Sequence, residues 1–157
     1  MPFLITITGA TQGIFKGESL LAAEANQSIA LGFSYEVNAP LDPATGLPTG
    51  KRVHSPIKIT KAVGVASPQI FTALVNNEAI TEARFDFFKT GAAGVKTTVY
   101  SVRISTAHIV DVTQQMDPVS SPGQPLDGIE FETVSFTFGK IEISDTVGAQ
   151  SASDDIA

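Results

Sequence analysis

Hydrophobic and polar residues alternate along much of this chain, which is the pattern of strands with one buried face. The alternation is clearest in residues 28–37 and also appears in several other segments. The strands predicted on this basis cover residues 3–8, 28–37, 52–60, 80–89, 95–112 and 132–143. Turns rich in glycine and proline separate them, so the pattern indicates antiparallel strands joined by short connections.

The last predicted strand changes face at a glycine. Phe136 and Phe138 have one parity, Ile141 and Ile143 have the other, and Gly139 lies between the two pairs. A strand that changes face at a glycine is typical of a β-bulge, so we expect the strand to bend there.

One amphipathic helix interrupts the strands. Ser67 is a suitable N-cap, Pro68 fits the first helical position, and Asn76-Asn77 ends the pattern. The apolar stripe of this helix consists of Ile70, Phe71, Leu74 and Val75. Many short strands with a single helix predict a mainly β fold, namely a small antiparallel β-barrel or sandwich that carries one α-helix.

Two segments fall outside this pattern. Residues 38–50 contain three prolines and two glycines, which predicts a long loop. A loop of this length in a compact domain usually has a function. Residues 148–157 are small and polar, so we expect a flexible C-terminal tail after a single domain that covers residues 1–147.

Composition and charge exclude several classes of function. The net charge is −6 and the largest basic cluster is the pair Lys51-Arg52, so we expect no binding to nucleic acid. No apolar run approaches the ~20 residues of a membrane span. The N-terminus lacks the basic region and cleavage site of a Sec signal peptide. The chain has no cysteine, which excludes disulfides, thiolate zinc sites and cysteine nucleophiles.

Candidate chemistry is sparse. His54 has the polar parity of its strand, and His108 shares the parity of the apolar residues in 95–112, so we expect His108 to pack in the core without a metal. No G-x-S-x-G elbow is present, and Glu130 and Glu132 look like a solvated stripe. We therefore predict that the protein is not an enzyme and that it has no catalytic residue, no metal site and no cofactor.

Several segments carry family motifs in a consistent order. They are the loop and strand 46–61, the helix 67–74, the strands 83–91 and 100–111, and the pattern E-x-V-S-F-x-F-G-K-I-x-I over 132–143. Together they resemble the Hcp (hemolysin-coregulated protein) family, whose members form the inner tube of bacterial type VI secretion systems. The resemblance covers most of residues 3–145.

The resemblance implies an assembly and a set of partners. It implies a small β-barrel with one helix, related in architecture to phage tail tube proteins, that forms homo-hexameric rings stacked into a tube. The implied partners are sheath, spike and effector proteins, with small effectors carried in the channel of the ring. It also implies assembly in the bacterial cytoplasm followed by secretion without a Sec signal peptide.

The channel of such a ring must lie between subunits, because a barrel of this size is filled by its own side chains. In the strand 28–37 we expect a bulky face to pack inward, and we expect Ala30, Gly32 and Ser34 to line the channel. The alternative is that these three residues only face solvent. If they line the channel, Gly32→Trp leaves the fold intact and impairs retention of cargo.

The long loop 38–50 is the candidate contact to a neighbouring subunit, and the alternative is a mobile surface turn. The residues expected at this contact are Leu41, Asp42, Pro43, Leu47 and Pro48. A rival function is a monomeric β-barrel that binds a small apolar ligand. Ten phenylalanines indicate a filled interior instead.

Overall fold

The computed structural model describes residues 3–17, 26–116 and 130–156, and it confirms a mainly β fold. Within these residues there is one helix, α1 (Ser67–Val75). The strands are β1 (Phe3–Gly9), β2 (Gly13–Ile14), β3 (Ser28–Ser34), β4 (Val37–Asn38), β5 (Val53–His54), β6 (Ile57–Ala62), β7 (Ala79–Thr90), β8 (Lys96–Gln115), β9 (Phe131–Thr137), β10 (Lys140–Asp145) and β11 (Gln150–Asp155).

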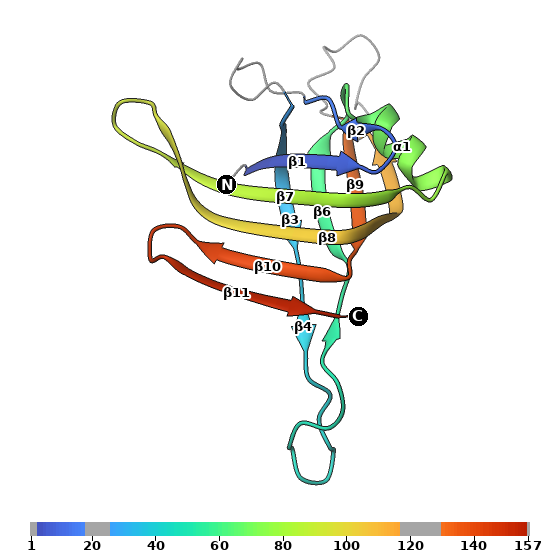
Figure 1. Ribbon diagram of the computed structural model, residues 1–157, viewed down its shortest axis with the longest axis vertical. Coiled ribbons are helices and arrows are strands. Elements are labelled where there is room, and N and C mark those ends of the chain that lie inside the picture. Colours follow the sequence, from blue (N-terminus) through green and yellow to red (C-terminus); the bar gives the residue numbers. More distant parts are fainter. Residues whose placement is uncertain (1–2, 18–25, 117–129, 157) are drawn as a thin grey trace, which may run out of the picture.

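Strands β8, β7, β1, β3, β6 and β9 pair in this order, and β9 pairs back with β8, so the sheet closes into a six-stranded barrel. Strands β10 and β11 continue the sheet outward from β8. In Figure 1, β7, β8, β10 and β11 run horizontally, while β3, β6 and β9 run vertically. The barrel therefore has two layers of strands that cross at a steep angle.

Aromatic side chains fill the space between these two layers. The ring centroids of Phe3 and Phe87 are 4.8 Å apart, and those of Phe33 and Phe85 are 5.6 Å apart. Phe136 on β9 lies 5.9 Å from Phe85. Phe3, Phe85 and Phe136 are almost completely buried, as expected of a small barrel that its own side chains fill.

The chain bends at two points that face each other, Thr106 within β8 and Gly139 between β9 and β10. After each bend, side chains of the parity that pointed into the core point outward, and the reverse. Thr106 has a positive φ of 50°, and the N–H of Gly139 opposite donates to the carbonyls of Ser105 and Thr106, each at 3.1 Å. The expected change of face at Gly139 is confirmed, because Phe136 and Ile141 are both buried.

The expectation of one continuous buried face along residues 95–112 is wrong. Burial passes from Ile104 to Ala107 across the kink, so the parity of β8 shifts by one residue. A second irregularity lies between Ile109 and Asp111. Val110 is consequently exposed, and His108 is only partly buried, not a core residue.

A buried ion pair connects the start of the helix to the barrel. The Nζ of Lys61 on β6 lies 2.6 Å from Oε1 of Glu132 on β9, and these side chains are 1% and 0% exposed. The hydroxyl of Ser67 donates to the same Oε1 at 2.7 Å, and Gln114 Nε2 donates to Oε2 at 3.2 Å. The expectation that Glu132 belongs to a solvated stripe is therefore wrong.

The helix begins one residue earlier than expected and buries a narrower stripe. Ala66 is the N-cap, and Ser67 is the first helical residue, with proline in the first turn. Ile70 is buried, but Phe71 and Val75 of the expected stripe are each 59% exposed. The helix thus packs by one edge and leaves an apolar flank uncovered.

The C-terminal segment is ordered, contrary to the expectation of a flexible tail. Residues 150–155 form β11, which pairs with β10 from Lys140↔Asp155 to Asp145↔Gln150. The small polar residues of β11 show no alternation of apolar and polar positions that would predict a strand. Their backbone nevertheless pairs with β10 along its whole length. The boundary expected at residue 147 therefore falls inside the sheet.

Candidate functional site

The predicted long loop is an ordered hairpin, which we call the arm (residues 37–54). Its strands β4 and β5 form a two-stranded sheet that is separate from the barrel sheet. Farther out, the N–H of Asp42 donates to the Leu47 carbonyl at 2.8 Å, and Thr49 donates to the Pro40 carbonyl at 2.6 Å. Figure 1 shows the arm projecting away from the barrel.

The tip of the arm gathers the five residues expected at a subunit contact. An isolated bridge pairs Leu41 with Pro48, and Asp42 accepts a hydrogen bond from the Ala44 N–H at 2.8 Å. Leu41 and Leu47 are 61% and 64% exposed. The arm therefore presents apolar side chains to its surroundings in a fixed local geometry. Of the five expected residues, Leu41, Pro43, Leu47 and Pro48 are exposed and Asp42 is partly buried.

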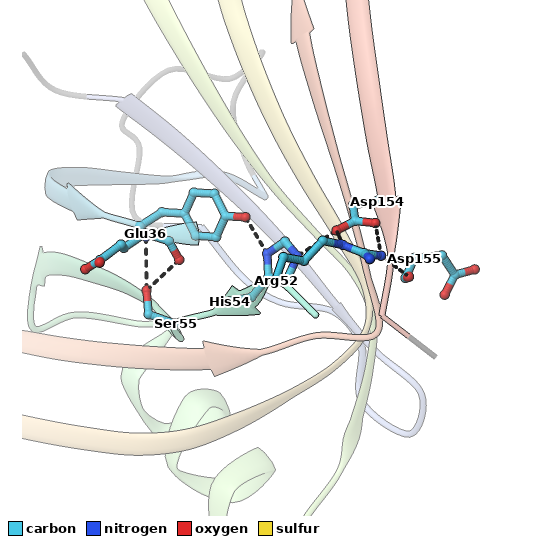
Figure 2. Close-up of polar contacts among 7 residues, drawn as sticks. Glu36, Arg52, His54, Ser55, Asp154 and Asp155 are labelled. Atoms are coloured by element: carbon cyan, nitrogen blue, oxygen red, sulfur yellow. Dashed lines mark hydrogen bonds and ion pairs between the residues drawn. The ribbon is translucent and has the colours of Figure 1, made fainter. Parts of the chain in front are cut away.

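Polar contacts fasten the base of the arm to the C-terminal strand. Arg52 forms a two-point ion pair with the Asp154 carboxylate and donates from Nη2 to the Asp155 carbonyl at 3.1 Å. On the other side of the base, Ser55 donates from its backbone N–H and its hydroxyl to the Glu36 carbonyl, each at 2.9 Å. Figure 2 shows Arg52, His54 and Asp154 pointing toward one another.

His54 links this carboxylate to a tyrosine. Its Nε2 lies 2.7 Å from Asp154 Oδ2, and its Nδ1 lies 2.6 Å from the Tyr35 hydroxyl. Hydrogen bonds from Arg52 and then from His54 lower the pKa of Asp154 to about 2, so its carboxylate only accepts at neutral pH. A neutral His54 must then donate from Nε2 and accept at Nδ1 from Tyr35.

Tyr35, which hydrogen-bonds to His54, is partly shielded from water. Burial, and then the negative charge of Asp154, raise the pKa of Tyr35, so its hydroxyl remains a donor at neutral pH. The Tyr35 and His54 rings are stacked with centroids 6.0 Å apart, and the Phe138 ring lies 5.7 Å from His54. The base of the arm therefore packs against Phe138, next to the kink at Gly139.

An apolar groove of about 190 Å³ lies between the base of the arm and the β10–β11 hairpin. Its polar end is formed by the Tyr35, His54 and Asp154 side chains. The remaining lining residues are Val37, Ile141, Ile143, Ala152 and Ser153. This groove lies at the base of the arm, whereas the exposed leucines lie at its tip.

The three residues expected to line a channel do not share one exposed face. Ala30 is 0% exposed and packs in the core, because the register of β3 against β6 shifts between Ala30 and Gly32. Ile29 and Leu31 are exposed instead, so the expectation of one bulky inward face along residues 28–37 is also wrong.

Gly32 is half-buried, and Ser34 is exposed. A Cβ on Gly32 would lie 3.2 Å from the Thr60 side chain, so Gly32→Trp would displace Thr60 and is unsuited to test cargo retention without disturbing the fold. Of the three residues, Ser34 alone offers a freely accessible side chain.

Sequence reasoning located the arm but missed its anchor. Arg52, His54 and Asp154 come together although about a hundred residues separate the first two from the third. The only sequence signal was the basic pair Lys51-Arg52 in an acidic chain. Among the described residues, no group of three or more histidine or carboxylate side chains could hold a metal ion. No helix in the described ranges is long and apolar enough to cross a membrane.

Comparisons with known proteins agree on one family. The family described as "Type VI secretion system effector, Hcp" matches residues 4–144. A curated relative, the "Major exported protein" of Pseudomonas aeruginosa, is 34% identical over 163 aligned positions, which cover 98% of this chain and 94% of the relative.

Solved structures show the same fold over the whole length. A crystal structure of an Hcp protein superposes with a TM-score of 0.88 at 24% identity and covers 99% of both chains. The secreted protein Hcp3 from Pseudomonas aeruginosa has a TM-score of 0.79 at 28% identity, with 99% of this chain and 98% of that chain covered.

Proposed function

The chain belongs to the Hcp family of type VI secretion proteins, and we propose that it is a non-enzymatic structural subunit whose copies form hexameric rings that stack into the expelled inner tube. The observation that carries this proposal is the arm, an ordered hairpin that extends from a closed barrel and exposes two leucines at its tip. The barrel core is complete without these side chains, so they are available to another molecule.

A second copy of the chain is the partner that best fits the arm. We propose that the tip of one copy meets a different surface of the next copy. Such a contact is heterologous, and a heterologous contact repeats from copy to copy until a ring closes or a stack extends. The exposed Leu41 and Leu47 would lose contact with water in such a contact, which is the usual source of association free energy.

The proposed tube would carry effectors in its channel and act with sheath and spike proteins. Ser34 is exposed on β3, so it is the one of the three expected residues that could face this channel. The curated relative is named for export, which supports export of this chain. We propose in addition that assembly in the cytoplasm precedes secretion. The filled barrel interior favours this proposal over a monomeric binder of small apolar ligands.

Sedimentation velocity over a range of concentrations tests the proposal. We expect the wild-type chain to reach a mass near six chains, and we expect Leu47→Asp to stay dissociated because a charge at the tip cannot be buried cheaply. Val95→Asp is the matched control, because Val95 is equally exposed (63% against 64%) but lies outside the arm.

Two results would contradict the proposal in different ways. A wild-type mass of one chain at every concentration would refute self-association. Full assembly of Leu47→Asp would show that the tip of the arm is not a subunit contact. Circular dichroism of each variant checks that the barrel is folded.

A further inference from the structure

The arm is attached to the barrel without being part of the barrel sheet. Its two strands pair only with each other in a separate sheet, so the barrel ladder does not fix its direction. Isolated two-stranded hairpins are marginally stable in water. One backbone hydrogen bond joins the two sides of its base, from the Ser55 N–H to the Glu36 carbonyl at 2.9 Å. Beyond this bond, the orientation of the arm depends on side-chain contacts at its base.

Those side-chain contacts converge on β11. Arg52 makes a two-point, charge-assisted pair with Asp154 and a further hydrogen bond to the Asp155 carbonyl, and His54 Nε2 lies 2.7 Å from the same carboxylate. Such pairs are shorter, stronger and more directional than neutral hydrogen bonds. One carboxylate on β11 thus holds two residues of the arm base, Arg52 and His54, as Figure 2 shows.

We propose that β11 is a latch for the arm: the Asp154 carboxylate holds Arg52 and His54 so that the arm keeps one orientation on the barrel, and association between copies depends on this orientation. The second half of the proposal rests on the function proposed above. Asp154 is a positioning residue, because it acts on a neighbouring copy through the arm.

The physical basis of the dependence is conformational entropy. A loose arm would have to be ordered when a partner binds, and this cost would be subtracted from the association free energy. A latched arm is ordered before binding, so the same tip contacts give a higher affinity. The latch also makes the C-terminal strand and the arm a single mechanical unit, although they lie at distant positions in the sequence.

Hydrogen exchange measured by mass spectrometry tests the latch on the full chain. The samples are dilute enough for sedimentation to show separate copies. In Asp154→Asn we expect peptides from residues 37–54 to exchange about tenfold faster, since a charge-assisted bond is lost. The control is Glu142→Gln, which also removes a carboxylate paired with an exposed arginine, Arg103, on the adjacent strand pair.

A second variant approaches the latch from the arm side. Arg52→Gln breaks the pair and leaves β11 unchanged, so it should accelerate exchange in the same peptides. The double variant Arg52→Gln, Asp154→Asn should exchange less fast than the sum of the two single effects predicts, because both single variants remove the Arg52–Asp154 pair. In sedimentation at higher concentration, each single variant should raise the dissociation constant about tenfold, and Glu142→Gln should not.

The outcomes separate the latch from the proposed function. Unchanged exchange in the arm overturns the latch, even if association weakens, because Asp154 would then be a contact residue. Faster exchange with unchanged association overturns the dependence of assembly on the latch. If the wild-type chain never associates, the proposed function fails and the assembly half of the inference falls with it, while the exchange data still decide whether β11 holds the arm.

Discussion

Glu132 shows how one buried carboxylate can organise three elements. It accepts hydrogen bonds from Lys61 on β6, Ser67 at the start of α1 and Gln114 on β8. Glu132 shares the parity of Val134 and Phe136, so alternation placed it inside, whereas its charge suggested solvent. The pattern was the better guide, because a buried charge is tolerated when it is paired and its lone pairs are occupied.

Removing one partner of this pair should be far more costly than removing both. We expect Glu132→Ala to lower the free energy of unfolding by about 3–5 kcal/mol, because the buried Lys61 ammonium would lose the carboxylate that it contacts at 2.6 Å. The double variant Lys61→Met, Glu132→Leu should cost much less. Urea denaturation measures both differences.

The surface pair Arg103–Glu142 is the matched control for the buried pair. Its atoms are 2.9 Å apart, but both side chains are accessible to water. Glu142→Ala should therefore cost no more than about 1 kcal/mol. Equal losses for Glu132→Ala and Glu142→Ala would show that burial of the first pair does not determine its contribution.

At the scale of elements, the kink at Thr106 and Gly139 redirects two strands together. A positive φ is strained for a β-branched residue such as Thr106, so surrounding structure must enforce it. The kink allows β8 to pair with β9 at one end and with β10 at the other. One long strand can therefore belong both to the closed barrel and to the sheet that carries β11.

A pair of substitutions tests whether this kink depends on the absence of a side chain at Gly139. A Cβ there would lie 3.2 Å from the Thr106 Cβ, so Gly139→Ala should destabilise the fold by about 1–3 kcal/mol. In a Thr106→Gly background, which removes the opposing atoms, most of that penalty should disappear. Thermal unfolding of the wild type, the two single variants and the double variant measures the coupling free energy between positions 106 and 139. The same penalty in both backgrounds would mean that backbone strain, and not the Thr106 side chain, limits Gly139.

The sequence was informative wherever an element followed a regular period. The strands, the helix and the long loop lie close to their expected positions, because alternation and turn residues are local signals. Expectations failed where the register shifted, at Ala30–Gly32 and at Thr106, since one irregular residue moves every following side chain to the other face.

Two other features carried no local signal. Strand β11 consists of small polar residues, and its pairing with β10 is visible only in three dimensions. The anchor of the arm joins His54 to Asp154, and only the closed sheet brings these two residues together. The arm itself could be located because its prolines and glycines interrupt the strand pattern.

At the scale of the whole molecule, charge opposes the proposed assembly while apolar contacts favour it. Each copy has a net charge of −6, so neighbouring copies in a ring repel one another at long range. Burial of the exposed leucines of the arm favours association, and this contribution does not depend on charge. The balance between the two effects should therefore shift with ionic strength.

Salt should strengthen association between copies. Raising NaCl from 0.1 M to 1 M shortens the screening length from about 10 Å to about 3 Å, which weakens repulsion between like-charged subunits. Sedimentation velocity at several salt concentrations measures the association constant, and unfolding midpoints at the same concentrations separate this effect from changes in fold stability. An association constant that falls with salt would indicate an interface dominated by ion pairs.

The closure of the barrel by β9 has a consequence for biosynthesis. The first strand, β1, pairs with β7 about eighty positions later, and the ring of strands is complete only when β9 joins β6 and β8. During translation the barrel cannot close until the whole of β9, up to residue 137, has left the ribosome. Until then the nascent chain exposes the phenylalanines of its future core, so its interval of greatest vulnerability to aggregation falls during translation.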